Sequence, residues 1–284
     1  MMTKKIAFLF LTLENPNFPK IWDKYFRSHK DKYSIYIHPK YPELLTWKKK
    51  NIIKNLKETQ WGFITGAYIE LLKEAFSDQN NYKFITISES CIPIQSFENF
   101  YEDAINDKRS WIKTMKIKNY NYKERILTQK TIPKPQHFIK HYARFCLNRE
   151  HTELLLSKEK ELNFFHKMHV GDEFFLSLLY PLKNVKDYAV IYDDWDYVKK
   201  QREIINLKIK LLYEEQESTH KNKMKEINEL KLLRDNISKN PKTITNVEED
   251  LDKIKNCNSY FYRKFSKNSN IEKYWKEIIE YHKK

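Results

Sequence analysis

The sequence predicts an α/β fold with a mostly parallel central sheet flanked by helices, and three observations lead to this prediction. Ile6 to Leu13 is a continuous apolar run ended by Glu14-Asn15-Pro16, which is typical of a central strand buried on both faces. Thr65 to Phe76 has the i, i+3, i+4 spacing of an amphipathic helix. β-Branched and aromatic segments at Tyr33 to His38 and Phe84 to Ile87 lie before and after that helix. This alternation of strand and helix indicates parallel strands covered by helices.

The other elements are assigned from local pattern in the same way. A helix is expected at Trp22 to His29, between the first two strands. Further expected elements are strand-like material at Trp111 to Ile117, a loop at Ile132 to Pro135, helices at Arg149 to Lys158 and Glu173 to Leu179, strands at Tyr188 to Tyr192 and Tyr260 to Phe265, and a last helix at Ile271 to Tyr281. No solenoid repeat or low-complexity linker interrupts the chain, so a single domain over residues 1–284 is predicted.

Residues 196–240 differ from the rest in carrying many long charged side chains. Their apolar residues recur at helical intervals, and these are Ile205, Ile209, Leu212, Met224, Ile227 and Leu230. We expect two helices joined around Ser218 to Asn222, which form a charged helical hairpin insertion ended by Pro241. The apolar positions keep no clean heptad, which favours a hairpin packed on its own domain over a partner-binding coiled coil.

The chain is strongly basic, with 53 Lys and Arg against 38 Asp and Glu, a formal charge of +15. A field of this sign attracts nucleic acid, anionic membranes or phosphorylated small molecules, and the sign alone does not choose among them. The excess is mostly Lys, accompanied by many Asn and Ile and only 3 Gly. An AT-rich genome produces that composition without functional selection, so the charge is weak evidence for nucleic-acid binding.

Cys91, Cys146 and Cys257 are far apart and form no C-x-x-C pair, so neither a zinc site nor a disulfide framework is suggested. We expect reduced thiols in a reducing compartment. The apolar run at Ile6 to Leu13 is too short for a membrane span and lacks a small-residue cleavage site. These features indicate a soluble, cytoplasmic protein without a transmembrane segment.

Several common chemistries are disfavoured by missing motifs. Gly62, Gly66 and Gly171 cannot form G-x-G-x-x-G or a Walker loop, and no G-x-S-x-G elbow is present. The isolated histidines lack the spacing of a zincin site, and surface or hydrogen-bonded core roles are favoured for His38, His137, His141 and His151.

An acidic pair, Asp172-Glu173, follows Gly171 and directly precedes the apolar segment Phe174 to Leu179. In the simpler interpretation Asp172 is a helix N-cap and Glu173 a first-turn acid favoured by the helix dipole. In the functional interpretation the helix start holds one carboxylate beside a cleft, where it removes a proton from an acceptor hydroxyl.

A second acidic cluster, Asp193-Asp194-Trp195-Asp196, ends a late strand. Carboxylate oxygens at such a place could hold Mg²⁺ or Mn²⁺ beside a diphosphate. In many sugar-nucleotide enzymes, however, the acidic metal motif follows an early strand. A strand-end and helix-cap role, with acceptor contact, is therefore favoured over metal ligation.

Ser259 to Phe265 places Arg263 and Lys264 in an aromatic frame. Two such cations can neutralise a diphosphate leaving group without a metal, although they could also be solvated residues of an ordinary strand.

Ser88-Glu89-Ser90, followed by Cys91 to Ile94, concentrates polar groups at a strand terminus. In an open α/β sheet, ligands bind at that terminus.

Taken in order, these segments resemble the Core-2/I-branching glycosyltransferase family, including its plant-type relatives. The matching stretches are Lys5 to Thr12, Tyr33 to His38, Trp61-Gly62 with Glu70-Leu71-Leu72, Ser88 to Ile94, Arg144 to His151, Gly171 to Leu179, Asp194-Trp195 and Tyr260 to Phe265. They cover about residues 5 to 195 and 257 to 266. The combination of S-E-S-C-I-P-I, D-E before an apolar segment, and R-K-F is specific in this order.

The resemblance implies a GT-A-like fold and an inverting, metal-independent transfer from a UDP-sugar, commonly UDP-N-acetylglucosamine, to a glycan or other hydroxyl acceptor. No cofactor and no nucleic-acid partner are expected. The family's D-E motif makes Glu173 the catalytic base, and its diphosphate-binding lysine falls on Lys264, with Arg263 second. A further family basic residue has no secure match, with Lys255 and Arg234 as candidates. The other implied donor-binding residues are Thr12, His38 and Trp61, and the implied acceptor or cleft residues are Ser88, Glu89, Ser90, Asp172, Asp194 and Trp195.

The chain departs from the family pattern in three places. His38-Pro39-Lys40 stands where some relatives have a nucleotide-contacting aspartate, so nucleoside recognition can differ. The family's G-S-Q-W-F stretch is replaced around Ala143-Arg144-Phe145-Cys146. The N-terminal membrane anchor usual in relatives of the secretory pathway is not seen, so acceptor identity is not carried over.

Two other classes of function remain open from sequence. A basic nucleic-acid-binding protein would use the Lys-rich helices at 196–240, and its binding would depend steeply on salt. A catalytically inactive sugar-nucleotide-fold protein would use the same hairpin to bind a partner and would transfer no sugar.

Overall fold

A computed structural model describes residues 3–115, 138–214, 220–237 and 240–283. Its largest sheet has the strand order β2-β1-β3-β8-β5-β9. The strands are β1 (Lys5–Thr12), β2 (Tyr33–Pro39), β3 (Asn81–Ser88), β5 (Ser110–Trp111), β8 (Cys146–Asn148) and β9 (Val185–Lys186). β1 pairs in parallel with β2 and β3, β5 with β9, and β8 alone runs antiparallel to its neighbours. The sheet is therefore mostly parallel, as predicted.

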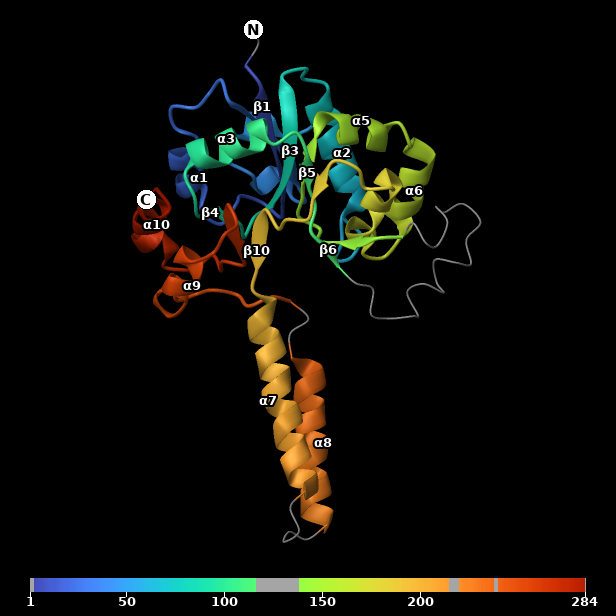
Figure 1. Cartoon of the computed structure of the whole chain (residues 1–284), viewed down its shortest axis with the longest axis vertical. Coiled ribbons are helices and arrows are strands. Elements are labelled where there is room, and N and C mark those ends of the chain that lie inside the picture. Colours follow the sequence, from blue (N-terminus) through green and yellow to red (C-terminus); the bar gives the residue numbers. More distant parts are fainter. Residues whose placement is uncertain (1–2, 116–137, 215–219, 238–239, 284) are drawn as a thin grey trace.

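Helices cover both faces of this sheet (Figure 1). The side chains of β1 alternate: Ile6, Phe8 and Phe10 pack with α1 (Pro19–Phe26) and α3 (Phe97–Asn106), whereas Ala7 and Leu9 pack on the other side. There they contact the layer of α2 (Thr65–Phe76), α5 (Arg149–Leu156) and α6 (Glu159–Lys167). Burial on both faces explains why β1 is a continuous apolar run.

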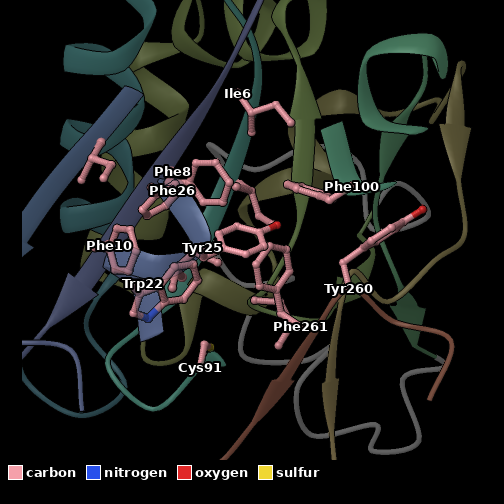
Figure 2. Packing of buried hydrophobic residues seen from close by; sticks show 14 of the residues in the cluster. Ile6, Phe8, Phe10, Trp22, Tyr25, Phe26, Cys91, Phe100, Tyr260 and Phe261 are labelled. Carbon is pink, nitrogen blue, oxygen red and sulfur yellow. The ribbon is translucent and has the colours of Figure 1, made fainter. Parts of the chain in front are cut away.

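Aromatic rings fill the layer between β1 and α1 (Figure 2). Phe8 lies edge-on to Phe26 with ring centroids 4.9 Å apart, and Trp22 stacks on Phe261 at 5.9 Å. Phe261 comes from the C-terminal part of the chain and is fully buried in this N-terminal core. Burying one such ring contributes about 2–3 kcal/mol, which fixes the strand that carries Phe261 against the main sheet.

That strand belongs to a small second sheet with the order β10-β11-β4. β10 (Ile191–Asp193) runs parallel to β11 (Phe261–Arg263), and β4 (Ile92–Pro93) runs antiparallel to it. The amide of Phe265 donates to the carbonyl oxygen of Ser90 at 3.0 Å, just beyond the end of β3. The segment after β11 is thus bound to the carboxyl edge of the main sheet.

The C-terminal helices cover this small sheet from outside. α9 (Leu251–Lys255) and α10 (Ile271–Tyr281) bury Ile254, Ile271 and Ile278 against Tyr262. The remaining short elements are β6 (Thr114–Met115) and β7 (Lys140–His141), which pair with each other, and the 3₁₀ helices η1 (Pro42–Leu44), η2 (Lys49–Asn51) and η6 (Glu248–Asp250).

Two long helices, α7 (Trp195–Glu214) and α8 (His220–Asn236), lie side by side and project from the rest of the molecule (Figure 1). Ile205, Ile209 and Ile227 form their shared core. The expectation that these helices pack on their own domain is wrong. Their apolar residues are used between the two helices, and Ile204, Leu207 and Leu211 are exposed. The expected joint at Ser218 to Asn222 lies wholly outside the residues whose side chains are described, and His220 to Asn222 belong to the start of α8.

Most predicted elements recur with shifted ends, and α2 and α10 have the predicted bounds. The helix predicted at Glu173 to Leu179 is wrong. Two 3₁₀ helices replace it, η4 (Gly171–Glu173) and η5 (Phe175–Leu179). Every residue of η5 is buried, and Pro181 follows it, so the segment is too short and too enclosed for regular α-helical turns. The end of the predicted strand at Trp111 to Ile117 and the loop at Ile132 to Pro135 lie outside the described residues.

Within the described part of the chain, none of the helices combines the length and the apolar character needed to cross a bilayer.

Candidate active site

The carboxyl ends of β1, β2 and β3 meet at one edge of the main sheet and carry Thr12, His38 and Ser88, all of them buried. The Thr12 hydroxyl donates to the Glu14 carbonyl at 2.7 Å, and Nε2 of His38 accepts from the Lys57 amide at 2.9 Å. Burial lowers the pKa of His38. Thr12 and His38 thus make hydrogen bonds within the protein. Their contact with a donor stays a prediction.

The polar segment after β3 lies between the main sheet and β11. Oγ of Ser88 is 3.4 Å from Oγ of Ser90 and 3.2 Å from Sγ of Cys91. The Glu89 carbonyl accepts from the amide of Asn17 at 2.8 Å. The Glu89 carboxylate is near enough to Lys264 to act on its pKa. The segment is therefore part of the same site as the end of β11.

The two basic residues predicted to bind a leaving group differ in their surroundings. Because β10 and β11 pair in parallel, Asp193 lies opposite Arg263, and their side chains form an ion pair of 2.7 Å. Lys264 follows and is half-buried; burial and the nearby Arg263 charge lower its pKa. Among the described residues, no hydrogen bond or ion pair holds its ammonium group. Arg263 is thus neutralised by the protein, whereas Lys264 is not.

Asp194 lies just beyond this pair and is fixed by the protein. Its carboxylate pairs with Lys253 at 2.6 Å and accepts from the Tyr197 amide at 3.3 Å, which caps the start of α7. The helix-cap interpretation therefore agrees with the structure. Trp195 begins α7 and is partly exposed, and its acceptor contact stays a prediction. No group of three or more His, Cys, Asp or Glu side chains within the described ranges is arranged to hold a metal ion.

The acidic pair sits on η4, whose position is set by glycine. Val170 precedes η4 in a left-handed conformation, with φ of 51°, and its amide donates to the Gly62 carbonyl at 2.6 Å. A Cβ added to Gly171 would lie 2.1 Å from the carbonyl oxygen of Phe165. Only glycine permits this approach, so the backbone leading to Glu173 is held tightly against α6.

Glu173 itself is partly exposed, and its Oε2 lies 2.9 Å from Nζ of Lys140 on β7. β7 is held in place by Ser177, whose hydroxyl accepts from the Ile139 amide at 2.8 Å and donates to the Ile139 carbonyl at 3.0 Å. The carboxylate is therefore oriented by a lysine and still reachable from solvent. That combination suits a group that must exchange a proton with a bound hydroxyl.

Trp61 lies beside this loop. Its ring centroid is 5.4 Å from that of His169, two residues before Gly171, and the side chain is 71% exposed. The structure thus places Trp61 near the acidic loop, and its predicted contact with a donor stays a prediction.

Asp172 has a different environment from its neighbour. It is 6% exposed, and burial raises its pKa to about 6, with the negative charge of Glu173 adding to the effect and Arg144 opposing it. The expectation that Asp172 is an N-cap is wrong, since Val170 occupies the capping position and η4 has no side-chain cap. Burial thus separates the two carboxylates: Asp172 is enclosed by the protein, whereas Glu173 can be reached from solvent.

Arg144 is near both acidic segments of the site, since the charges of Asp193 and Asp172 act on it. The Phe145 amide donates to the Thr86 hydroxyl at 3.1 Å, which places the adjacent Arg144 at the carboxyl end of β3. Arg144 is 9% exposed, and its Nη1 donates to the Tyr68 hydroxyl at 2.5 Å and to the Ala143 carbonyl at 3.1 Å. Burial raises the pKa of Tyr68 to about 12. Arg144 and Tyr68 are therefore buried polar neighbours of the predicted site.

Sequence reasoning missed Arg144, Tyr68 and Lys140 as site residues. The signal for Arg144 was its place in the stretch that replaces G-S-Q-W-F, whereas Tyr68 reads as an ordinary core residue of an amphipathic helix. Lys255 pairs instead with Glu277 at 2.5 Å, and Arg234 lies on the projecting helix α8. The charges that act on Lys264 come from other residues.

Residues 6–210 match the family model described as Core-2/I-Branching enzyme. The chain is also similar to the protein named Glycosyltransferase BC10 of Oryza sativa subsp. japonica. The two are 26% identical over 174 residues, which make up 57% of this chain and 43% of that protein. The match therefore covers less than half of this relative's length.

Proposed function

Because the chain belongs to the Core-2/I-branching enzyme family, we propose that it is a glycosyltransferase that transfers a sugar from a UDP-sugar to a hydroxyl acceptor. The observation that carries this proposal is the pairing of a partly exposed carboxylate, Glu173, with a cation-rich strand end at Arg263 and Lys264. Arg144 connects the two electrostatically, since its charge acts on the pKa of Asp172, next to Glu173, and on that of Lys264. A base and a leaving-group site are the two parts that such a transfer needs.

In the proposed reaction, Glu173 accepts the proton of an acceptor hydroxyl as its oxygen attacks the anomeric carbon of the donor. A new C–O bond forms on the face opposite UDP, and the bond from the anomeric carbon to the diphosphate oxygen breaks. The electron pair leaves with UDP, so the anomeric configuration is inverted. Lys264, with Arg263, stabilises the negative charge that develops on the diphosphate.

We propose that these cations, and not a divalent metal, neutralise the leaving group. Lys264 supports this proposal because no carboxylate of the described residues pairs with it. A lysine in that state can give its charge to the diphosphate without first breaking an ion pair. The donor sugar, which family resemblance suggests is N-acetylglucosamine, and the acceptor are to be identified by screening.

The test combines binding with turnover. The full chain is screened against UDP-sugars by thermal shift, because a ligand that binds the native state raises its melting temperature as concentration exceeds Kd. Donors that stabilise the protein are then assayed for transfer to sugar acceptors with and without EDTA, and the product anomer is determined by NMR. We expect chelator-resistant transfer with inversion. No stabilisation by any UDP-sugar, or transfer that EDTA abolishes, would contradict the proposal.

A second candidate function, binding of a partner by α7 and α8, is favoured by the exposed Ile204, Leu207 and Leu211. These residues recur at a spacing of three and four along α7 and form one apolar stripe that α8 does not cover. Sedimentation of the wild-type chain and of an Ile204→Lys, Leu211→Lys variant tests whether the stripe mediates self-association. If both proteins sediment as monomers, the stripe does not mediate self-association.

A further inference from the structure

Arg144 is a buried cation without an ion-pair partner in the described part of the chain. Its hydrogen bonds go to two uncharged oxygens, the Tyr68 hydroxyl and the Ala143 carbonyl. Its Nε is buried and finds no acceptor among the described residues. The carboxylates that act on it, Asp193 and Asp172, are farther away than an ion pair requires.

This arrangement is unfavourable for a structural arginine. A guanidinium stays charged in proteins and cannot escape the cost of burial by losing its proton. An unpaired buried charge is strongly destabilising, and even a complete buried ion pair can often be replaced by apolar residues without loss of stability. A ligand that brings negative charge would remove this cost. The unpaired state therefore points to an anion that binds next to Arg144.

Two further cations lie at the same place. The charges of Arg144 and Arg263 both act on the pKa of Lys264, and both act on the thiol of the fully buried Cys91. Asp193 is engaged by Arg263 at 2.7 Å. Three cations and three carboxylates thus act on one another here, but only Arg263 and Asp193 form an ion pair. Arg144 and Lys264 make no ion pair with Asp172 or Glu89 among the described residues.

We propose that Arg144 is a third anion-binding residue of the site, which contacts the diphosphate of the nucleotide-sugar donor together with Lys264 and Arg263. This inference rests on the proposed function. A diphosphate suits the three cations better than a single carboxylate does, because it has two charged groups and several acceptor oxygens that can be bound at once. The hydrogen bonds to Tyr68 and Ala143 engage only Nη1 of the guanidinium and leave its other N–H groups for the ligand.

The family pattern does not supply this residue, since Arg144 lies in the stretch that replaces G-S-Q-W-F. Its place also has a consequence for the reaction. Arg144 acts on the pKa of Asp172, the neighbour of Glu173, and on that of Lys264. Its charge therefore acts on a residue next to the proposed base and on the proposed leaving-group lysine.

The test compares Arg144→Met with Arg144→Lys, Lys264→Met and the control Arg202→Met, which removes an exposed arginine of α7. Binding of UDP, inorganic pyrophosphate, uridine and glucuronate to each full-length protein is measured by calorimetry. We expect Arg144→Met to weaken UDP and pyrophosphate binding about 10- to 100-fold, as expected for a lost charged hydrogen bond, and to leave uridine binding unchanged. Arg144→Lys should lose less, and Arg202→Met nothing.

Stability without ligand separates this role from a structural one. If Arg144 served only to anchor β8 to Tyr68, Arg144→Met would lower the free energy of unfolding. The proposal expects unliganded Arg144→Met to be as stable as wild type or more stable, with the stabilisation by UDP lost. Tyr68→Phe, which removes the hydroxyl and keeps the ring, should weaken UDP binding less than Arg144→Met does.

Three results would overturn the inference: wild-type affinity of Arg144→Met for UDP and pyrophosphate, an equal loss of uridine binding, or an Arg144-dependent response to glucuronate alone. Failure of the proposed function gives a different result. A protein that binds pyrophosphate through Arg144 but transfers no sugar would retain the anion site and lose the proposed activity. If instead the wild type transfers sugar and Arg144→Met binds UDP normally, the proposed activity stands and Arg144 is not part of the anion site.

Discussion

Asp172 gives a prediction about stability that does not depend on the substrate. Burial raises its pKa from 3.8 to about 6, so the folded protein binds this proton more tightly than the unfolded chain does. The free energy of unfolding should therefore fall as pH rises from about 4 to about 6 and should stay lower above that range. At about 1.36 kcal/mol per pH unit, the contribution of Asp172 is about 3 kcal/mol.

Asp172→Asn removes this titration and keeps the shape of the side chain. Urea unfolding of both proteins is measured at intervals from about pH 4 to pH 7.5. We expect the variant to gain about 3 kcal/mol relative to wild type over that range, whatever constant difference the amide introduces. His141, whose pKa burial lowers to about 4, titrates in both proteins and cancels in the comparison. A difference that does not change with pH would refute the reasoning, because it would mean that Asp172 is not protonated near pH 6.

Two further predictions concern backbone approach and helix packing. Gly171→Ala should displace η4, because the new Cβ would lie 2.1 Å from a backbone oxygen. We expect the free energy of unfolding in urea to fall by about 1–3 kcal/mol and transfer to slow at least tenfold. Unchanged values of both would contradict the close packing. Ile227→Ala leaves a cavity between α7 and α8, where Ile227 is fully buried. It should lower the local stability of these helices by about 2–5 kcal/mol in hydrogen exchange, with amides of β1 and β3 unchanged; equal loss in both regions would show that the helices unfold with the rest of the chain.

The sequence predicted the parallel part of the fold because the relevant signals are local. Strand β1 is buried on both faces and therefore reads as a continuous apolar run, and α2 keeps one clear apolar face. The segment Gly171 to Leu179 failed for the opposite reason. Its apolar residues pack on several sides, so periodicity could not separate an α-helix from two short 3₁₀ helices.

The site was only partly predictable. Glu173 and Lys264 lie in motifs that can be read in order along the chain; Glu173 ends η4, and Lys264 directly follows β11. Arg144 and Lys140 become site residues through contacts with Tyr68 and Glu173, which are distant in sequence. Such contacts depend on the register of β8 against β3 and of β7 against β6, and periodicity does not contain that information.

The direction of α7 and α8 was also outside the reach of pattern reasoning. Ile205, Ile209 and Ile227 give a helical spacing that fits packing against either a domain or a second helix. The structure shows that the two helices use these residues on each other. Only the tertiary arrangement could decide between the two possibilities, because both bury the same residues.

The most direct test of the central claim is the turnover of Glu173→Gln with a donor and acceptor found by screening. The amide keeps the size of the side chain and its contact with Lys140 but cannot accept the acceptor proton. We expect kcat to fall by about 10²- to 10⁴-fold, the usual contribution of a general base, while the Kd for UDP and the urea midpoint stay within about twofold of wild type. A folded Glu173→Gln protein that binds UDP and turns over at the wild-type rate would contradict the assignment of Glu173 as the base.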